Sequence, residues 1–467
     1  MASKKKIYAY PRHEPEVKVP VHASKAVAVV RTFGARSNEH AVRDILARKA
    51  CGSLFGLWLL IAEFRILGTW ERLVRWTRKP HDAVEPRLAL QLVNEAALCS
   101  TGIRARQRMC NEGFELANGL PWVATDTAIH DLLDAHSAHD ACAYQVELGR
   151  IRRACGHLPL RLVAIDPHRV RSSTIRRMVK AVPSPGAPPT SIANLFFAID
   201  AESKQPVAFT LHTSDQTTSQ ATPGLVQLIH DIAPDAFVRT VADAEHCTHS
   251  LVSHFAADPN ASLLTPLPVT KAMLRFCRAI PDTDFVHVCA GFAYATAFYS
   301  SHVFDSLRVL VQRIGMHPDD FSFKPFALSD DPGDRPLSLL VSDFPDRWHI
   351  EEFFRNDGHI AWDRAATHNI NIRFNHMALA LDAQAALHQF RQRIPSPFSS
   401  WTAPALAHDL LAALDGDVRV CRDTILVTFY NAPFDSSTAD FYRHLPSALE
   451  RINVDPRIPW LFDFNRS

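Results

Sequence analysis

Glycine is scarce in this sequence, cysteines are never closely paired, and no apolar run is long. The 467 residues include 16 glycines against 31 prolines, so we expect stiff connections between folded units. The nine cysteines are odd in number and never form a C-x-x-C pair, which indicates reduced thiols and argues against a disulfide framework or a zinc ribbon. The longest uncharged apolar run, residues 50–62, is shorter than the roughly 20 residues that span a bilayer and predicts a buried helix. Since no apolar segment follows the basic start, we expect no secretory signal and a cytoplasmic protein.

Charge nearly cancels over the whole chain but is unevenly placed. Hydrophobic residues make up 47% of the chain and charged residues 21%, with a formal net charge of +1, which is typical of a globular protein. At this length we expect about two to four modules. Up to residue 80, however, sixteen Lys and Arg residues oppose six Asp and Glu residues. Such a segment can neutralise the phosphates of a nucleic acid, although a solvated tail has the same composition.

The first 157 residues carry helical patterns. Residues 1–40 have no periodicity and read as a basic arm, and apolar residues recur at helical spacing after it. Around Gly119 and Pro121, two short helices joined by a turn are compatible with a helix-turn-helix, although any helical hairpin has the same pattern. We therefore predict a basic arm with the first helices in 1–80 and a helical DNA-binding region in 81–157.

Two aspartates each follow an apolar strand in the β-rich stretch that begins at residue 158. The run LVAID ends in Asp166, a predicted hairpin and helix follow, and the run VRTVAD ends in Asp243. A buried strand fixes a carboxylate at its end while the loop beyond admits a ligand. One strand-ending aspartate is ordinarily a turn residue, but two of them around a hairpin and a helix indicate a site.

A third acid follows a second β-rich stretch. Short β-like runs between 263 and 343 predict an insertion, and the run DFPDRWHIEEFFRNDGH after it predicts a helix on which Arg347 and Glu351 share a face. Such a pair is by itself a common surface salt bridge. Glu352 is an alternative to Glu351 for the functional role. Asp200 ends another strand and is an alternative to Asp166. Asp200 also opens a tight turn, however, which is an ordinary use of aspartate.

The combination resembles the DDE transposases of bacterial insertion sequences, in the group with the signature Y-x2-R-x3-E-x6-K. Here Phe344 stands for the Tyr, Arg347 and Glu351 match, and Gly358 stands where the Lys would be. The resemblance covers residues 158–392. It is carried by the phrases VAID, FFAID…PVAFTLHTSD, VADAEHC and RWHIEEFF together, since each phrase alone is ordinary.

The predicted elements come in the order of three strands, a helix and a fourth strand. This order and the resemblance together predict an α/β fold. Its centre would be a ribonuclease H-like core, a mixed sheet with flanking helices, interrupted by a β-rich insertion. A helical DNA-binding region would precede the core, and a small α/β unit that contains a hairpin would follow it. The divisions that we expect beyond residue 157 are 158–262 and 344–393 for the core, 263–343 for the insertion and 394–467 for the last unit.

The resemblance implies cleavage and joining of DNA strands with two Mg²⁺ or Mn²⁺ ions. Divalent cations stabilise the attacking and leaving oxygens of a phosphodiester from about 3.5–4 Å apart, and carboxylates suit them as ligands. Asp166 would bridge the metals, and Asp243 and Glu351 would each hold one of them. The expected partners are the terminal inverted repeats and target DNA, with a homodimer joining two DNA ends at the nucleoid, and no membrane.

Several residues are candidates for DNA contact. Arg347 would grip a phosphate, and His359 would weakly replace the missing Lys. Phe344 would stack on DNA or pack in the core, and Trp348 would stack on a displaced base or pack at the helix start. A cationic rim is expected around Asp166, although it also reads as solvated surface; its members are Arg152, Arg153, Arg161, Arg169, Arg171, Arg176, Arg177 and Lys180.

Three other hypotheses stay open from the sequence. His246, Cys247 and His249 lie close enough together to suggest a zinc site, although no second pair of ligands accompanies them. A decayed transposase that only binds DNA is favoured by the missing Lys and disfavoured by the three acids. A general nuclease with the same core would cut DNA without sequence preference and would not join strands.

Overall fold

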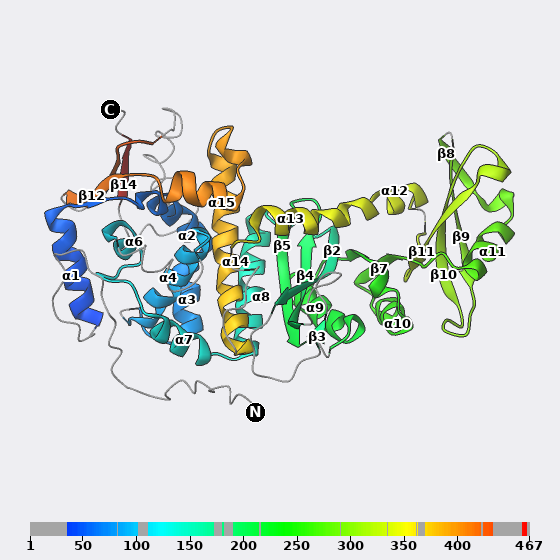
Figure 1. Ribbon diagram of the computed structural model, residues 1–467, viewed down its shortest axis with the longest axis horizontal. Helices are drawn as coiled ribbons and strands as arrows, with labels where there is room; N and C mark the ends of the chain where they lie inside the picture. The colour runs from blue at the N-terminus through cyan, green and yellow to red at the C-terminus, as the bar shows by residue number, and fades with distance from the viewer. Residues whose placement is uncertain are drawn as a thin grey trace, which may run out of the picture.

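The computed structural model describes most of the chain, and Figure 1 shows it in full. The described residues are 35–81, 83–100, 111–171, 180–181, 190–213, 216–289, 291–333, 335–360, 362, 369–421, 424–432 and 460–464. Most of the basic arm that we expect at 1–40 lies outside them. Among the described residues, no helix combines the length and the apolar character needed to cross a bilayer.

The amino-terminal helices pack around one long buried helix, α14 (Ile370–Arg393), near the middle of the molecule (Figure 1). Seventeen of the 24 residues of α14 are buried, polar side chains such as Asp382 and Gln384 among them. The elements that precede the sheet are α1 (Ala35–Arg48), η1 (Phe55–Leu60), α2 (Ile61–Leu67), α3 (Thr69–Thr77), α4 (Glu85–Ala97), α6 (Glu112–Ala117), α7 (Asp126–Asp134) and α8 (Ala138–Ala154). Of these, η1, α2, α4, α7 and α8 contact α14 directly.

The apolar run 50–62 is buried as expected, but it does not form one helix. Strand β1 (Ala50–Gly52) comes first, and η1 and the start of α2 follow. Leu54 between them adopts a left-handed backbone with φ of 66°, which ends any continuous helix.

The central sheet places β2 (Leu162–Arg171) between β4 (Thr190–Asp200) and β6 (Val238–Ala242). Strand β4 runs antiparallel to β2 and to β5 (Gln205–Thr213), so the predicted hairpin is confirmed. Strands β2, β6 and β7 (Ala261–Pro266) are parallel to one another. The order β5-β4-β2-β6-β7 thus combines antiparallel and parallel pairs in one mixed sheet; the two-residue strand β3 (Lys180–Ala181) adds to β4.

The two faces of this sheet have separate apolar cores. Val163 and Ile165 of β2 point toward α9 (Thr218–Ile232) and α10 (His249–Ala257). Ala164, between them, points toward α14 and the helices around it. Because successive side chains of a strand alternate in direction, Asp166 belongs to the α14 face.

The β-rich segment after β7 has its own apolar core. Four antiparallel strands form it: β8 (Val286–Cys289), β9 (Phe292–Tyr299), β10 (Leu307–Ile314) and β11 (Ser322–Leu328). Helix α11 (Lys271–Ala279) packs against this core through Met273 and Cys277. Strand β11 pairs with β7, which joins the segment to the central sheet, at the right of Figure 1.

Two expectations for this segment need correction. We began the insertion at 263, but Leu263 and Leu264 pair with β6, so the central sheet continues through β7. The run 336–344 is not a strand: it forms α12 (Leu337–Ser342) and enters the 3₁₀ helix η5 (Phe344–Trp348). Pro336 directly before α12 suits a helix start, because proline lacks the N–H that a first turn leaves unpaired.

The last part of the chain returns to the helical half of the molecule. The helix expected from 346 to 393 is interrupted, since η5 and α13 (His349–Asp357) precede the separate helix α14. The predicted hairpin is confirmed as β12 (Gly416–Cys421) and β13 (Thr424–Phe429), which β1 and β14 (Trp460–Phe464) flank. The remaining short elements are η2 (Ala244–His246), η3 (Asp282–Asp284), η4 (Pro318–Asp320), η6 (Phe398–Ser400), α15 (Ala403–Leu406) and η7 (Ala407–Leu411). The protein is therefore mixed α/β, with one large mixed sheet and many helices.

Candidate active site

The register of two parallel strands brings Asp166 and Asp243 side by side. Ile165 of β2 is paired with Ala242 of β6, and each aspartate is the next residue of its chain. Neighbouring strands lie about 4.7–4.9 Å apart, so the two carboxylates meet at one edge of the sheet. Asp243 follows the last residue of β6, as predicted, but Asp166 does not end its strand, because β2 continues to Arg171 through its pairing with β4. The two predicted acids are nonetheless neighbours in the sheet.

Two aromatic contacts hold the segment of the third acid over this edge. The ring of Phe344, at the start of η5, packs edge-on against Phe326 of β11, with centroids 5.2 Å apart. Phe354 of α13 stacks on His168 of β2 at 3.7 Å and an interplanar angle of 8°. An ion pair of 2.9 Å between Asp343 and Arg239 of β6 adds a third contact. Helix α13, with Glu351, is thus fixed to the strand that carries Asp166.

Arg347 connects the first and third acids. Its Nη1 donates a hydrogen bond of 3.1 Å to Oδ1 of Asp166, and its Nη2 lies 3.6 Å from Oε1 of Glu351. The guanidinium is 14% exposed, and its Nε is buried without a hydrogen-bond partner. The Arg347–Glu351 pair is therefore more than a surface salt bridge, because the same cation also pairs with Asp166 of β2.

Burial and neighbouring charges set the protonation of the two aspartates in opposite directions. Burial raises the pKa of Asp166 to about 6; Arg347 opposes this rise, and the negative charges of Asp243 and Glu351 add to it. Burial also opposes ionisation of Asp243, but a hydrogen bond and positive charge from His246 outweigh it and lower the pKa. The two aspartates and Glu351 are thus close enough for their charges to act on one another.

His246, in the turn after β6, holds Asp243 in place. Its Nδ1 donates to Oδ1 of Asp243 at 2.8 Å, and the backbone N–H of Glu245 donates to the same oxygen at 3.0 Å. The imidazole is fully buried, and its Nε2 has no partner. From the sequence, His246 was a candidate for zinc binding only. Its hydrogen bond to Asp243 could have been suspected from the spacing of three residues between them.

The chemistry of the donor set suits hard divalent cations, although the carboxylates are not gathered around one point. Among the described residues, no three His, Cys, Asp or Glu side chains are close enough together to hold a metal ion. Arg347 stands between two of the acids and supplies positive charge there. Oxygen ligands that repel one another, as the raised pKa of Asp166 shows, are the kind that Mg²⁺ or Mn²⁺ stabilises.

The competing acids have other partners. Asp200 is fully buried and accepts hydrogen bonds from the backbone N–H groups of Leu160 and Ser203, at 2.6 and 2.7 Å, so it fixes its turn. Glu352 forms an ion pair of 3.1 Å with Lys204, on the exposed side of α13. Their positions favour Asp166 and Glu351 as the functional acids.

Two observations on the turn after β6 argue against a zinc site there. His246 already uses Nδ1 for Asp243. Burial raises the pKa of Cys247 to about 11, so its thiol is disfavoured as the thiolate that binds zinc.

Of the aromatic and imidazole candidates for DNA contact, Trp348 and His359 are exposed. The side chain of Trp348 is 57% exposed, with the guanidinium of Arg347 5.5 Å from its ring centre, so packing in the core is the wrong alternative for it. Trp348 and Glu351 line an open hollow of about 430 Å³ with Arg355. His359 is exposed, and Phe344 is half-buried in the contact described above. Trp348 is therefore the aromatic side chain that is available to a ligand.

The expected cationic rim is only partly present. Arg152 is buried in α8 and donates to Gln205 and the carbonyl of Pro206, so its assignment to the rim was wrong. Arg153 pairs with Asp235. Arg161 is exposed.

Two further parts of the rim lie nearer to Asp166 along β2. Arg169 forms an exposed ion pair of 2.8 Å with Glu245. The side chain of Arg171 and the whole of Arg176 and Arg177 lie outside the described residues, as does the side chain of Lys180.

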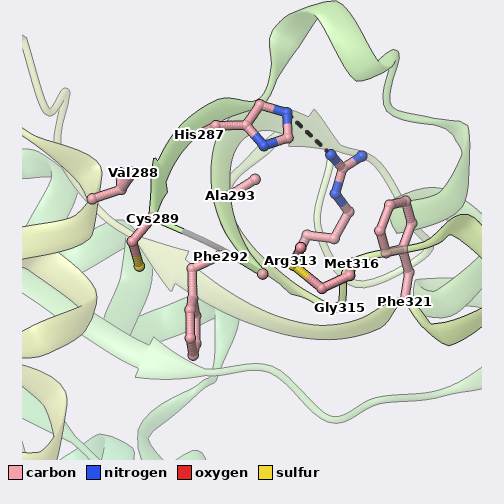
Figure 2. Close-up of a pocket in the computed structure, with 10 residues that line it drawn as sticks. His287, Val288, Cys289, Phe292, Ala293, Arg313, Gly315, Met316 and Phe321 are labelled. Carbon is pink, nitrogen blue, oxygen red and sulfur yellow. Dashed lines mark hydrogen bonds between the residues drawn. The ribbon is translucent and has the colours of Figure 1, made fainter.

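A second cavity, of about 400 Å³, lies in the insertion and not among the acids. Figure 2 shows His287, Cys289, Phe292 and Arg313 around it, with the guanidinium of Arg313 hydrogen-bonded to the His287 ring. Arg313 is itself enclosed by aromatic rings and paired with Asp282 at 2.6 Å. This cavity is therefore lined by groups that already satisfy one another.

Comparisons with known proteins give a similarity of arrangement but none of sequence. No family model and no curated protein sequence matches the chain. Among solved structures, the chain is similar to a piggyBac transposase in a synaptic complex with hairpin DNA, with a TM-score of 0.40 and 9% sequence identity. The similarity covers 79% of this chain and 81% of that one.

Proposed function

We propose that this protein is a DDE-type transposase, which cleaves DNA and joins the cut ends to new DNA with the help of divalent metal ions. The observation that carries the proposal is Asp166, inside β2, beside Asp243, which follows the end of the parallel strand β6, with Arg347 joining Asp166 to Glu351. The three acids come from distant parts of the sequence, and the charges of Asp243 and Glu351 both act on Asp166. Such an arrangement suits phosphodiester chemistry, in which charge must be stabilised at both the attacking and the leaving oxygen.

The strand order supports a ribonuclease H-like core for this enzyme. Two antiparallel pairs, β5-β4 and β4-β2, lie on one side of β2, and the parallel strands β6 and β7 lie on the other. Helix α9 connects β5 to β6, and the β-rich insertion separates β7 from α13. This order supplies the first two acids from neighbouring strands and the third from a helix beyond the insertion.

In the proposed reaction, the carboxylates of Asp166, Asp243 and Glu351 would hold two Mg²⁺ or Mn²⁺ ions, which would supply stabilisation of charge on the attacking and leaving oxygens. The charges of Asp243 and Glu351 both act on Asp166, so Asp166 is a neighbour of each of the other two acids. His246 keeps one oxygen of Asp243 engaged, so the second oxygen is left for a metal.

Arg347 has a second role once metals neutralise the acids. Its present partners, Asp166 and Glu351, would then be occupied, and its fork of donors becomes available to a phosphate oxygen near the cut. Trp348 stands directly beside it, exposed at the hollow next to Glu351. An unpaired base from the DNA end can stack there.

The proposed partners follow from the same chemistry. The ends of the protein's own insertion sequence, as terminal inverted repeats, would be the specific DNA, and other DNA would be the target. Two copies of the chain would join two ends in a synaptic complex. Recognition of the ends belongs to the amino-terminal region in this proposal.

Cleavage and joining of labelled DNA that carries the element's ends, with Mg²⁺ or Mn²⁺, tests the proposal. Asp243→Ala removes a metal ligand worth several kcal/mol of transition-state stabilisation, so activity falls by more than about 10³-fold. Glu351→Gln is expected to have the same effect, and Glu352→Gln, whose side chain pairs with Lys204, serves as the matched control with activity close to wild type. Equal activity of wild type and Asp243→Ala would remove the metal site from the mechanism.

A protein that only binds DNA is the second candidate, and Gly358 at the position of the signature Lys favours it. It predicts tight binding to the element's ends with no metal-dependent product. A general nuclease predicts cutting of unrelated DNA at the same rate and no joined product. The same assay separates the three functions when unrelated DNA is included.

A further inference from the structure

We propose that helix α11 of the insertion is a DNA-contacting surface, on which Lys271, Arg275 and Arg278 bind the phosphate backbone away from the three acids. The inference rests on the proposed function for the choice of DNA as the partner. It starts, however, from a feature of the protein alone, a row of exposed cations without acid partners.

The three cations occupy one face of α11. Lys271, Arg275 and Arg278 follow one another at spacings of four and three residues, so their side chains lie on the same face of the helix. The opposite face is buried, with Met273 and Cys277 in the core of the insertion. All three cations are exposed, and the nine residues of α11 include no acid. The helix therefore presents positive charge to solvent along its whole length.

This row is unusual within the insertion because its charges are not neutralised. Three other arginines of the insertion each pair with an aspartate: Arg308 with Asp331, Arg313 with Asp282 and Arg335 with Asp330. By contrast, no side chain of the row forms a hydrogen bond or an ion pair with another described residue. Lys271 also stands at the first position of α11, where the partial positive charge of the helix end disfavours a cation. Like charges at this spacing repel one another, and an anion that lies along the row relieves the repulsion.

A nucleic-acid backbone fits this row better than another protein does. A helix rises 1.5 Å per residue, so the row extends over about 10 Å, and the phosphates of one DNA strand follow one another every 3.4 Å along the duplex axis. Three cations in line can therefore meet phosphates of about three successive base pairs. The other exposed residues of α11 are Ala272 and Ala279, so the helix lacks the large apolar side chains that anchor protein partners.

The place of α11 in the chain suits DNA that continues beyond the point of cleavage. Thr265 of β7 donates a hydrogen bond to the carbonyl of Asp243, and α11 begins shortly after β7 ends. The insertion thus starts at the edge of the sheet where Asp243 lies, and Figure 1 shows α11 at the right of the molecule, away from α13. A DNA duplex is stiff over about 150 base pairs, so DNA held at the acids runs on past the protein. Helix α11 would hold a part of that DNA that the acids do not touch.

DNA affinity as a function of salt, measured in EDTA, tests the proposal. The probes are a duplex that carries the element's ends and a duplex of the same length and unrelated sequence. Loss of one phosphate contact reduces the slope of log affinity against log salt by about 0.9. Arg275→Gln/Arg278→Gln is therefore expected to reduce the slope by about 1.8 and the affinity roughly 10-fold. Both duplexes should show the change, because backbone contacts carry no sequence information.

Two matched variants make the test specific to α11. Arg275→Lys/Arg278→Lys keeps both charges and is expected to keep the slope, since the slope counts neutralised phosphates. Arg308→Gln/Arg335→Gln removes the same charge from the same insertion, but from arginines that pair with aspartates, and should leave the slope close to that of wild type. Because the cations of α11 are exposed and unpaired, the Tm of Arg275→Gln/Arg278→Gln should stay within about 2 °C of wild type.

An unchanged slope in Arg275→Gln/Arg278→Gln overturns the proposal. An equal reduction in Arg308→Gln/Arg335→Gln also overturns it, since it would show an effect of net charge alone. A change confined to the duplex with the element's ends would show base recognition and overturn the assignment to the backbone. Because no metal is present, these results do not depend on cleavage. A failure of the proposed transposase activity in the Asp243→Ala comparison is thus distinguishable from a failure at α11.

Discussion

At the scale of single residues, Asp166 combines two opposing influences. Burial and the negative charges of Asp243 and Glu351 favour its neutral form, and Arg347 favours its charged form, with a resulting pKa of about 6. A metal ion binds only the charged form. The affinity of the proposed site for metal would therefore be linked to the protonation of one carboxyl group.

The affinity for Mn²⁺ is expected to rise with pH up to about 6 and to level off above it. Below pH 6 each binding event releases a proton from Asp166, so affinity changes by up to about tenfold per pH unit. Calorimetric titration of Mn²⁺ in buffers of different ionisation enthalpy measures both the affinity and the proton release. Asp166→Asn, as control, binds weakly at every pH, and a pH-independent affinity in wild type would contradict the expectation.

The same carboxyl group affects the stability of the metal-free protein. Its pKa is higher in the folded chain than in the unfolded chain, where it is near 3.8, so its contribution to stability is lost as pH rises from about 4 through 6. The free energy of unfolding of Asp166→Asn, relative to wild type, should therefore grow over this window and stay constant above it. Urea unfolding at several pH values in EDTA measures this difference. A difference that shrinks with rising pH would have the wrong sign.

His246 is a positioning residue for Asp243. His246→Ala leaves the carboxylate without its 2.8 Å hydrogen bond, so metal affinity and cleavage rate fall by about 10–100-fold. His246→Asn keeps a donor near the position of Nδ1 and should recover part of both. Mn²⁺ affinity by calorimetry and cleavage rate at saturating metal separate the two effects. Equal affinity in His246→Ala and wild type would leave the imidazole with a packing role only.

At the scale of elements, the strands were predictable and the contacts of the site were not. Alternation and apolar runs locate β2, the β4-β5 hairpin and β6, and with them the position of Asp243 at the end of β6. The end of the apolar run at Asp166 is not the end of a strand, because the polar residues after it continue to pair with β4. Sequence spacing could not show that Arg347 reaches Asp166, because this contact depends on how η5 packs across the sheet.

The missed elements also have physical reasons. Helix α12 is short and rich in leucine and valine, so it reads equally well as a strand. For α12, contacts with the rest of the chain decide between the two structures. Strand β10 is a different case, because the alternation of Leu307, Val309 and Val311 toward the core of the insertion was a signal that the sequence offered.

Two glycines in helical elements are expected to respond oppositely to alanine. A Cβ at Gly56 in η1 would lie 2.6 Å from the backbone of Leu411, so Gly56→Ala should cost about 1–3 kcal/mol. A Cβ at Gly224 in α9 meets nothing within 4 Å, so Gly224→Ala should stabilise by about 0.5–1 kcal/mol. Urea unfolding of both variants measures the pair. Similar stability of the two would show that η1 can move away from Leu411.

At the scale of the whole molecule, α14 joins the amino-terminal helices to the central sheet. Asp382, in the middle of α14, is fully buried and is bound by Arg72, Thr69 and Tyr144 from the surrounding helices. Nearer its start, Phe374 of the same helix packs against Phe209 of β5, with ring centroids 5.3 Å apart. The region expected to recognise DNA and the sheet that carries two of the proposed catalytic acids therefore share one rigid element.

Removing one side of this buried network should destabilise the whole protein. Asp382→Ala leaves Arg72 buried without its counter-charge and is expected to cost about 3–5 kcal/mol. The double variant Arg72→Met/Asp382→Leu removes both charges and should recover much of the loss. Urea midpoints followed by circular dichroism test the order, and a double variant less stable than Asp382→Ala would contradict it.

The insertion is joined to the central sheet by a short strand pairing, which affects how force passes between them. Three residues of β11 pair with β7. One of their partners in β7, Thr265, also donates a 2.6 Å hydrogen bond to the backbone carbonyl of Asp243. A load that tilts the insertion thus pulls on the peptide of the second acid. In the proposed transposase, tension in bound DNA that reaches the insertion would thus be transmitted to the backbone of Asp243.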